Sequence, residues 1–174
     1  VEGALIEPLA IGINAAMTGG VKLGDTVLVI GAGCIGLVSL LAAKACGAAK
    51  VIVADVLPNR LKVAEKLGGI AVNSREKDLV AEVMKLTGGK GAQVVLDCAG
   101  FSKTVSDSIR SAAIAGKIVV VGLGESDLNG LPFGLVSVHE LTITSIFRYR
   151  NIYPSAINAA AAGSIDISGI ISDR

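Results

Sequence analysis

The chain has 174 residues, a length that favours a single domain. Its residues are 52% hydrophobic and 18% charged, a mixture typical of a parallel α/β sheet that is buried on both faces. The net charge of +1 and the lack of a basic patch argue against nucleic acid as a partner, and the charged residues and glycine that interrupt the longest apolar stretch argue against a membrane span.

Apolar periodicity and turn residues divide the chain into alternating helices and strands. Pro8 suits the first turn of an opening helix, and Gly19 and Gly20 end that helix. The elements predicted after it are, in chain order, strand 25–30, helix 34–47, strand 50–55, helix 57–68, strand 70–73, helix 77–89, strand 93–100, helix 103–116, strand 117–124, strand 141–147, helix 153–163 and a candidate tail strand 164–170.

This alternation predicts right-handed βαβ units and a parallel sheet. The main strands fit the doubly wound order 3-2-1-4-5-6. The expected fold is therefore an α/β Rossmann domain, with a six-stranded parallel sheet and helices on both faces, and residues 1–174 are expected to form one dinucleotide-binding domain.

Three glycines with the spacing G-x-G-x-x-G follow the first predicted strand and open a helix. In such a motif, Gly31 allows the tight turn, Gly33 lets a pyrophosphate approach the backbone, and Gly36 lets the helix pack close to the sheet. The helix N-terminus offers free N–H groups to the phosphates. An acid, Asp55, ends the next strand 19 residues after Gly36, and this context favours dinucleotide binding over an ordinary strand-to-helix turn.

Asp55 also favours NAD over NADP. Its carboxylate can accept hydrogen bonds from the ribose hydroxyls and would repel a 2′-phosphate, whereas Arg60 nearby keeps NADP open because an arginine can hold that phosphate. A competing class, the S-adenosylmethionine methyltransferases, also has a glycine-rich first turn and an acid after the second strand. The third glycine and the sixth strand favour a dinucleotide.

Several segments together resemble the coenzyme domain of the zinc-dependent medium-chain dehydrogenases, over essentially the whole chain and in family order. Those segments read "LIEPLAIGINAA", "GDTVLVIGAGCIGLVSLLAAKACGA", "VIVADVLPNRLKVAEKLG", "VVLDCAG", "VVVGLG" and "IFRYRN". The stretches "EPL" and "FRYRN" look most like the polyol branch, which contains sorbitol and xylitol dehydrogenases.

The resemblance implies roles for particular residues. Ile35, in the glycine turn, would contact the cofactor through its backbone and side chain, and Asp55 and Arg60 would hold the adenosine ribose. Six residues would line the nicotinamide end: Val121, Gly122, Leu123, Ile146, Phe147 and Arg148. Arg148 and Tyr149 would also reach the polyol, and Glu7 would lie beside the catalytic zinc through a water. The plainer interpretations are that Glu7 is a helix N-terminal acid and that Tyr149 covers surface.

The resemblance also implies that the zinc ligands lie in a separate catalytic domain that is absent from this chain. A catalytic zinc takes three protein ligands such as Cys, His or Glu, and this sequence has one histidine, His139. Cys34, Cys46 and Cys98 have no C-x-x-C spacing, which indicates a reducing, cytoplasmic compartment. Cys34, at a helix N-terminus, is expected to have a lowered thiol pKa.

The resulting hypothesis is the coenzyme domain of an enzyme that moves hydride from a secondary alcohol of a polyol to NAD, giving a ketose. A zinc-free reductase of the quinone reductase type and a non-catalytic dinucleotide sensor remain alternatives. The stretch "ELTITSIF" would form a sheet edge rich in β-branched residues, so a homodimer or homotetramer through the sixth strand is expected.

Overall fold

The structure, a computed structural model, describes residues 2–149 and 151–171 and contains a six-stranded sheet in the order β3-β2-β1-β4-β5-β6. Every neighbouring pair of strands is parallel. The strands are β1 (Thr26–Ile30), β2 (Lys50–Asp55), β3 (Ile70–Asn73), β4 (Ala92–Asp97), β5 (Ala112–Val120) and β6 (Thr142–Ser145). The predicted doubly wound Rossmann fold is confirmed, although residues 1, 150 and 172–174 of the predicted domain lie outside the described residues.

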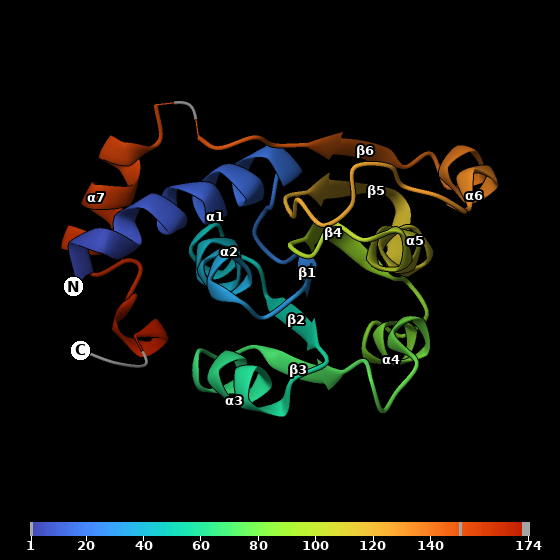
Figure 1. The fold of residues 1–174 in the computed structure, drawn as a ribbon, viewed down its shortest axis with the longest axis horizontal. Coiled ribbons are helices and arrows are strands. Elements are labelled where there is room, and N and C mark those ends of the chain that lie inside the picture. Colours follow the sequence, from blue (N-terminus) through green and yellow to red (C-terminus); the bar gives the residue numbers. More distant parts are fainter. Residues whose placement is uncertain (1, 150, 172–174) are drawn as a thin grey trace.

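Helices cover both faces of this sheet (Figure 1). They are α1 (Ile6–Gly19), α2 (Cys34–Ala45), α3 (Pro58–Lys66), α4 (Leu79–Leu86), α5 (Ser102–Ser111), α6 (Phe133–Val138) and α7 (Tyr153–Ala161), with short 3-10 turns at Glu2–Leu5 and Ser168–Ile170. In Figure 1, α2 and α3 lie on one side of the strands and α4 and α5 lie on the other, while β6 and β3 form the two ends of the sheet.

The apolar core follows this layering. On one face, β-strand side chains such as Val53 pack with Leu40 of α2 and Ala64 of α3, and on the other face Leu28 packs with Val83 of α4 and Ile109 of α5. A third cluster joins α1, α2 and α7 beyond the sheet. The two faces together leave β1 and β4 buried, as the near-continuous apolar runs of a parallel sheet predict.

The predicted helix over 103–116 is partly wrong, because α5 ends at Ser111 and β5 begins at Ala112. Ala112 is paired with Ala92 of β4, and the pairing then shifts register before Lys117. Ala115, inside this irregular stretch, has a φ of 58° and donates its N–H to the carbonyl of His139. Sheet pairing has therefore overridden the helical propensity of the alanines.

Two further differences concern the second half of the chain. The helix α6, of 6 residues, is not among the predicted elements. The candidate tail strand over 164–170 is wrong, because a 3-10 turn lies at Ser168–Ile170 instead. Within the described part of the chain, no helix combines the length and the apolar character that a membrane crossing needs.

Candidate functional site

The glycine turn between β1 and α2 has a different steric constraint at each of its three glycines. Gly31 has a φ of 99°, a conformation that other residues rarely adopt, and donates its N–H to the carbonyl of Ala54 at 2.7 Å. A Cβ on Gly36 would lie 1.7 Å from the carbonyl oxygen of Gly31, so the helix packs directly on the turn. A Cβ on Gly33 would meet nothing within 4 Å, so open space lies over this residue.

Asp55, at the carboxyl end of β2, is held beside this turn. Its Oδ2 accepts the N–H of Ala32 at 2.7 Å and its Oδ1 accepts the N–H of Leu57 at 2.9 Å. The residue is buried, and Nη1 of the half-exposed Arg60 lies 3.7 Å from Oδ2. Two backbone donors therefore fix the orientation of the carboxylate, and each oxygen retains a lone pair for a further donor.

A cavity of about 380 Å³ surrounds the turn and Asp55. It brings together four residues predicted from the sequence, Gly31, Gly33, Asp55 and Arg60. It also contains residues that the sequence reasoning missed, among them Ser74, Cys98, Ala99, Phe101 and Thr104. These follow β3 and β4, and the rule that ligands bind at the carboxyl ends of parallel strands could have found them.

A second cavity, of about 420 Å³, lies against the same edge of the sheet. It is lined by Ile35, predicted as a cofactor contact in the glycine turn, and by all six residues predicted for the nicotinamide end: Val121, Gly122, Leu123, Ile146, Phe147 and Arg148. Ile11 of α1 and Cys98 complete its wall, and neither residue belongs to the predicted site. Because Cys98 lines both cavities, the two hollows adjoin where the strand order reverses between β1 and β4.

Asp97, the last residue of β4, organises the loops between the two cavities. Its Oδ1 accepts the N–H groups of Ala99 and Gly100 at 2.9 Å, and its backbone carbonyl accepts those of Val121 and Gly122. Burial raises the pKa of the Asp97 carboxyl, and the hydrogen bonds from Gly100 and Ala99 act in the opposite direction. Asp97 therefore positions the loops that follow both β4 and β5.

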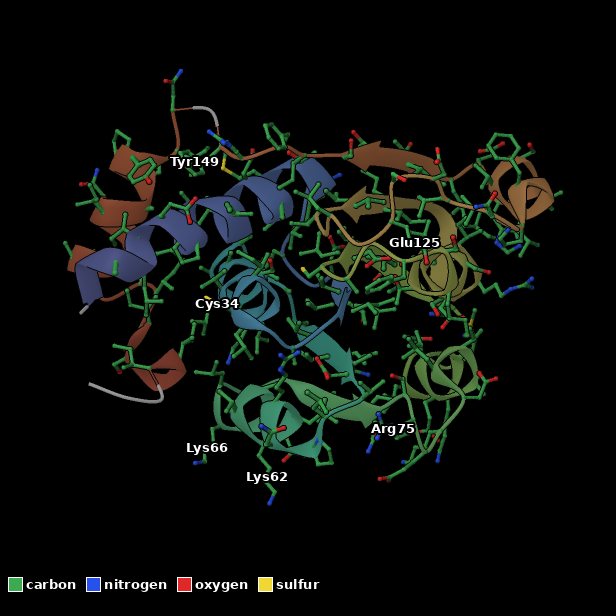
Figure 2. The ribbon with its side chains drawn as sticks, viewed as in Figure 1. Cys34, Lys62, Lys66, Arg75, Glu125 and Tyr149 are labelled. Carbon is green, nitrogen blue, oxygen red and sulfur yellow. The ribbon has the colours of Figure 1, made fainter. Side chains whose placement is uncertain are left out.

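Tyr149 and Tyr153 form a polar pair at the junction of α1 and α7. Their hydroxyl groups lie 3.1 Å apart and their rings meet edge to face with centroids 4.7 Å apart. The hydrogen bond with Tyr149 is the main reason that the pKa of Tyr153 rises to about 12, and the negative charge of Glu7 also contributes. Both tyrosines pack against the third apolar cluster, so Tyr149 is more than surface cover (Figure 2).

Arg148, which precedes this pair, has a φ of 60°, an uncommon conformation for a residue other than glycine. The side-chain amide of Asn14 donates to its carbonyl at 3.0 Å, and its guanidinium lies 5.3 Å from the centroid of the Phe147 ring. Glu7 lies in the first turn of α1, where an acid is favoured by the helix dipole.

The prediction of a lowered pKa for Cys34 is wrong. Burial raises the pKa of this thiol, and the negative charge of Glu7 raises it further. Burial also raises the pKa of Cys98, to about 12. The favourable field of the α2 N-terminus is therefore outweighed at Cys34 by desolvation and by a nearby carboxylate.

Metal ligands do not gather in the part of the chain that the structure describes. Residues 2–149 and 151–171 contain no group of three or more His, Cys, Asp or Glu side chains that could hold a metal ion. His139 directly follows α6, at the C-terminal end of this helix.

Comparison with known proteins identifies the family. A family model described as zinc-binding dehydrogenase matches residues 34–162, which include Gly36, Asp55 and the residues of the second cavity from Ile35 to Arg148. The chain belongs to the zinc-binding medium-chain dehydrogenases. It corresponds to their NAD(P)-binding domain, so the resemblance stated from the sequence motifs is confirmed.

Relatives of this dehydrogenase domain cover nearly its full length. It is 40% identical over 173 residues to an uncharacterized zinc-type alcohol dehydrogenase-like protein, YdjJ, from Escherichia coli, and 40% identical over 177 residues to sorbitol dehydrogenase from Bos taurus. The alignments cover 98% and 99% of this chain and 49% of each relative, so the chain spans about half the length of these proteins.

A solved structure agrees with the fold of the dehydrogenase domain. A putative zinc-binding dehydrogenase from Sinorhizobium meliloti, bound to NADP, matches 99% of this chain and 52% of its own with a TM-score of 0.93 and 30% sequence identity.

Proposed function

We propose that this domain binds NAD for a zinc-dependent dehydrogenase that oxidises a secondary alcohol of a polyol to a ketone. The observation that carries the choice of NAD is the Asp55 carboxylate, which two backbone N–H groups hold at the edge of the first cavity. A carboxylate in this place accepts hydrogen bonds from ribose hydroxyls and repels a 2′-phosphate. Arg60, whose Nη1 lies 3.7 Å from Oδ2 of Asp55, is the residue that keeps NADP open, because an arginine beside this position can hold a 2′-phosphate.

Each part of the site has a role in holding the cofactor. The open space over Gly33, at the N-terminus of α2, fits a pyrophosphate that accepts hydrogen bonds from the free N–H groups of the helix. The second cavity, walled by apolar residues such as Ile146 and by the loop at Gly122, suits a nicotinamide ring and shields it from water. When bound, the cofactor supplies the hydride chemistry, and the protein orients its reactive ring.

The polyol assignment is supported by two observations. Sorbitol dehydrogenases from several mammals are 38–42% identical to this chain, and an L-idonate 5-dehydrogenase from Vitis vinifera is 39% identical. Arg148 lines the second cavity, and the paired hydroxyls of Tyr149 and Tyr153 follow it in the chain. We propose that Arg148 and Tyr149 contact the hydroxyl-rich substrate and that Glu7 lies near the zinc, whose ligands are outside the described residues.

The activity assay separates this proposal from a quinone reductase. A protein that joins this chain to a zinc-bearing catalytic domain is expected to form NADH from sorbitol, xylitol or iditol and to leave quinones unreduced. The 174-residue chain alone is expected to show no turnover with these polyols and NAD, with or without added zinc, because its described residues offer no set of metal ligands. Quinone reduction by the longer protein, or polyol oxidation by the chain alone, would contradict the proposal.

We also propose that the protein forms a homodimer or homotetramer through the edge of β6. This strand pairs with β5 on one side only, and Thr142, Ile143 and Ser145 are exposed on it. Exposed strand edges with β-branched residues favour pairing with a second copy. A cytoplasmic location remains an expectation from the cysteine pattern.

A further inference from the structure

The loop after β5 and the loop after β4 are in backbone contact. A Cβ on Gly100 would lie 2.3 Å from the carbonyl oxygen of Gly122, and a Cβ on Gly124 would lie 2.5 Å from that of Ala99. Only glycine fits at this separation, because the atoms in the way are backbone atoms that cannot rotate aside. The position of the loop after β5, which lines the second cavity, therefore depends on its contacts with the loop after β4.

Glu125 follows Gly124 in the loop after β5 and makes the hydrogen bonds that hold this loop in place. Its N–H donates to the carbonyl of Gly100 at 2.9 Å. Its Oε2 accepts the N–H of Ser102 at 3.0 Å and also accepts the hydroxyl of Ser102. The hydroxyl oxygen of Ser102 in turn accepts the N–H of Asn129 at 2.9 Å. Glu125 lies beside α5 in Figure 2. Its side chain binds Ser102, the first residue of this helix, and Ser102 binds Asn129, so both ends of the segment 125–129 are held to α5.

The free N–H groups at the N-terminus of α5 need a hydrogen-bond acceptor from elsewhere in the chain. Ser102 is the first residue of α5, and the residue before it, Phe101, has no side-chain oxygen with which to cap the helix. A carboxylate at this end is favoured by the helix dipole and makes charge-assisted hydrogen bonds. The hydrogen bonds from Ser102 lower the pKa of the Glu125 carboxyl, because they stabilise its charged form.

We propose that Glu125 is a positioning residue, which holds the segment 121–123 in place as the wall of the nicotinamide cavity by binding the N-terminus of α5. The inference rests on the proposed function, since it assigns the second cavity to the nicotinamide. Glu125 does not line either cavity, so it acts through the loop and not through contact with the cofactor.

The test compares Glu125→Ala with Asp127→Ala in the 174-residue chain. Asp127 lies in the same loop and is also exposed, and among the described residues its carboxylate accepts a hydrogen bond only from the hydroxyl of Ser126. This control therefore removes the same charge without breaking the contact with Ser102. NAD and ADP-ribose, which lacks the nicotinamide ring, are titrated calorimetrically into each variant. Glu125→Ala is expected to weaken NAD by about fivefold while ADP-ribose and the Asp127→Ala variant change by less than about twofold.

Amide hydrogen exchange, measured without any ligand, tests the role of Glu125 independently of cofactor binding. The amides of residues 121–125 are expected to exchange about threefold faster or more in Glu125→Ala than in the wild type and in Asp127→Ala. Equal weakening of NAD and ADP-ribose, unchanged NAD affinity, or unchanged exchange would overturn the positioning role. A wild-type chain that binds neither NAD nor NADP would instead refute the proposed function, and the exchange result alone would then decide whether Glu125 fastens the loop.

Discussion

Gly36→Ala is expected to destabilise the chain by about 3 kcal/mol and to abolish dinucleotide binding, because overpacking against backbone cannot be relieved by a change of rotamer. The added Cβ would lie 1.7 Å from the carbonyl oxygen of Gly31 and 2.8 Å from its carbonyl carbon. Either the helix α2 moves away from the sheet or the glycine turn changes shape. Urea unfolding and calorimetric titration of NAD measure the two effects.

Gly134→Ala is the matched control for this experiment. Gly134 lies in α6, and a Cβ there would meet nothing within 4 Å. This variant is expected to keep the stability of the wild type to within about 1 kcal/mol, because alanine is the better helix former. A Gly36→Ala variant that is as stable as Gly134→Ala and binds NAD normally would contradict the role given to close packing at Gly36.

Asp55→Ala is expected to weaken NAD by about thirtyfold, or about 2 kcal/mol, because hydrogen bonds to a charged group contribute about 1.5–3 kcal/mol each. NADP is expected to bind the variant as tightly as the wild type or more tightly, since a repulsive charge is removed and Arg60 is released from its contact with Oδ2 at 3.7 Å. Calorimetric titration of both cofactors into both proteins gives the four affinities.

Asp55→Asn separates the charge from the structural role of the side chain. Asp55→Ala also leaves the N–H groups of Ala32 and Leu57 without their acceptor, whereas asparagine retains one acceptor oxygen. Both variants are expected to lose the preference for NAD over NADP. The alanine variant is expected to lose more stability than the asparagine variant. If the wild type already binds NADP as tightly as NAD, Asp55 does not determine the choice of cofactor.

The elements that positioned the site were predictable because their signals are local. The strand 50–55 and the strand 70–73 have the predicted bounds, and the strand-glycine-helix sequence around Gly31 and Gly36 predicted the turn that is found. Asp55 was found because the acid ends the strand after the motif. Because these features depend on residues within one βαβ unit, the sequence pattern is sufficient to predict them.

The rest of the site depends on contacts between distant segments. Ile11, Cys98 and Ser74 enter the cavities only because the strand order brings the ends of β3, β4 and β1 to one edge beside α1. The pKa of Cys34 was predicted in the wrong direction because desolvation raises it and because Glu7, 27 residues earlier, lies close enough to raise it further. The helix over 103–116 was overextended because the pairing of Ala112 with Ala92 is not visible in a stretch rich in alanine.

Titration of NAD into the wild type and into Gly33→Ala tests the central claim, that the glycine turn holds the pyrophosphate of a dinucleotide. Gly33 has a φ of −71°, which alanine adopts without strain, and an added Cβ meets no protein atom within 4 Å. The variant is therefore expected to keep its stability to within about 1 kcal/mol. It is also expected to lose at least about tenfold in NAD affinity, because the methyl group would occupy the space of the phosphates. A variant that folds normally and binds NAD as tightly as the wild type would contradict this account.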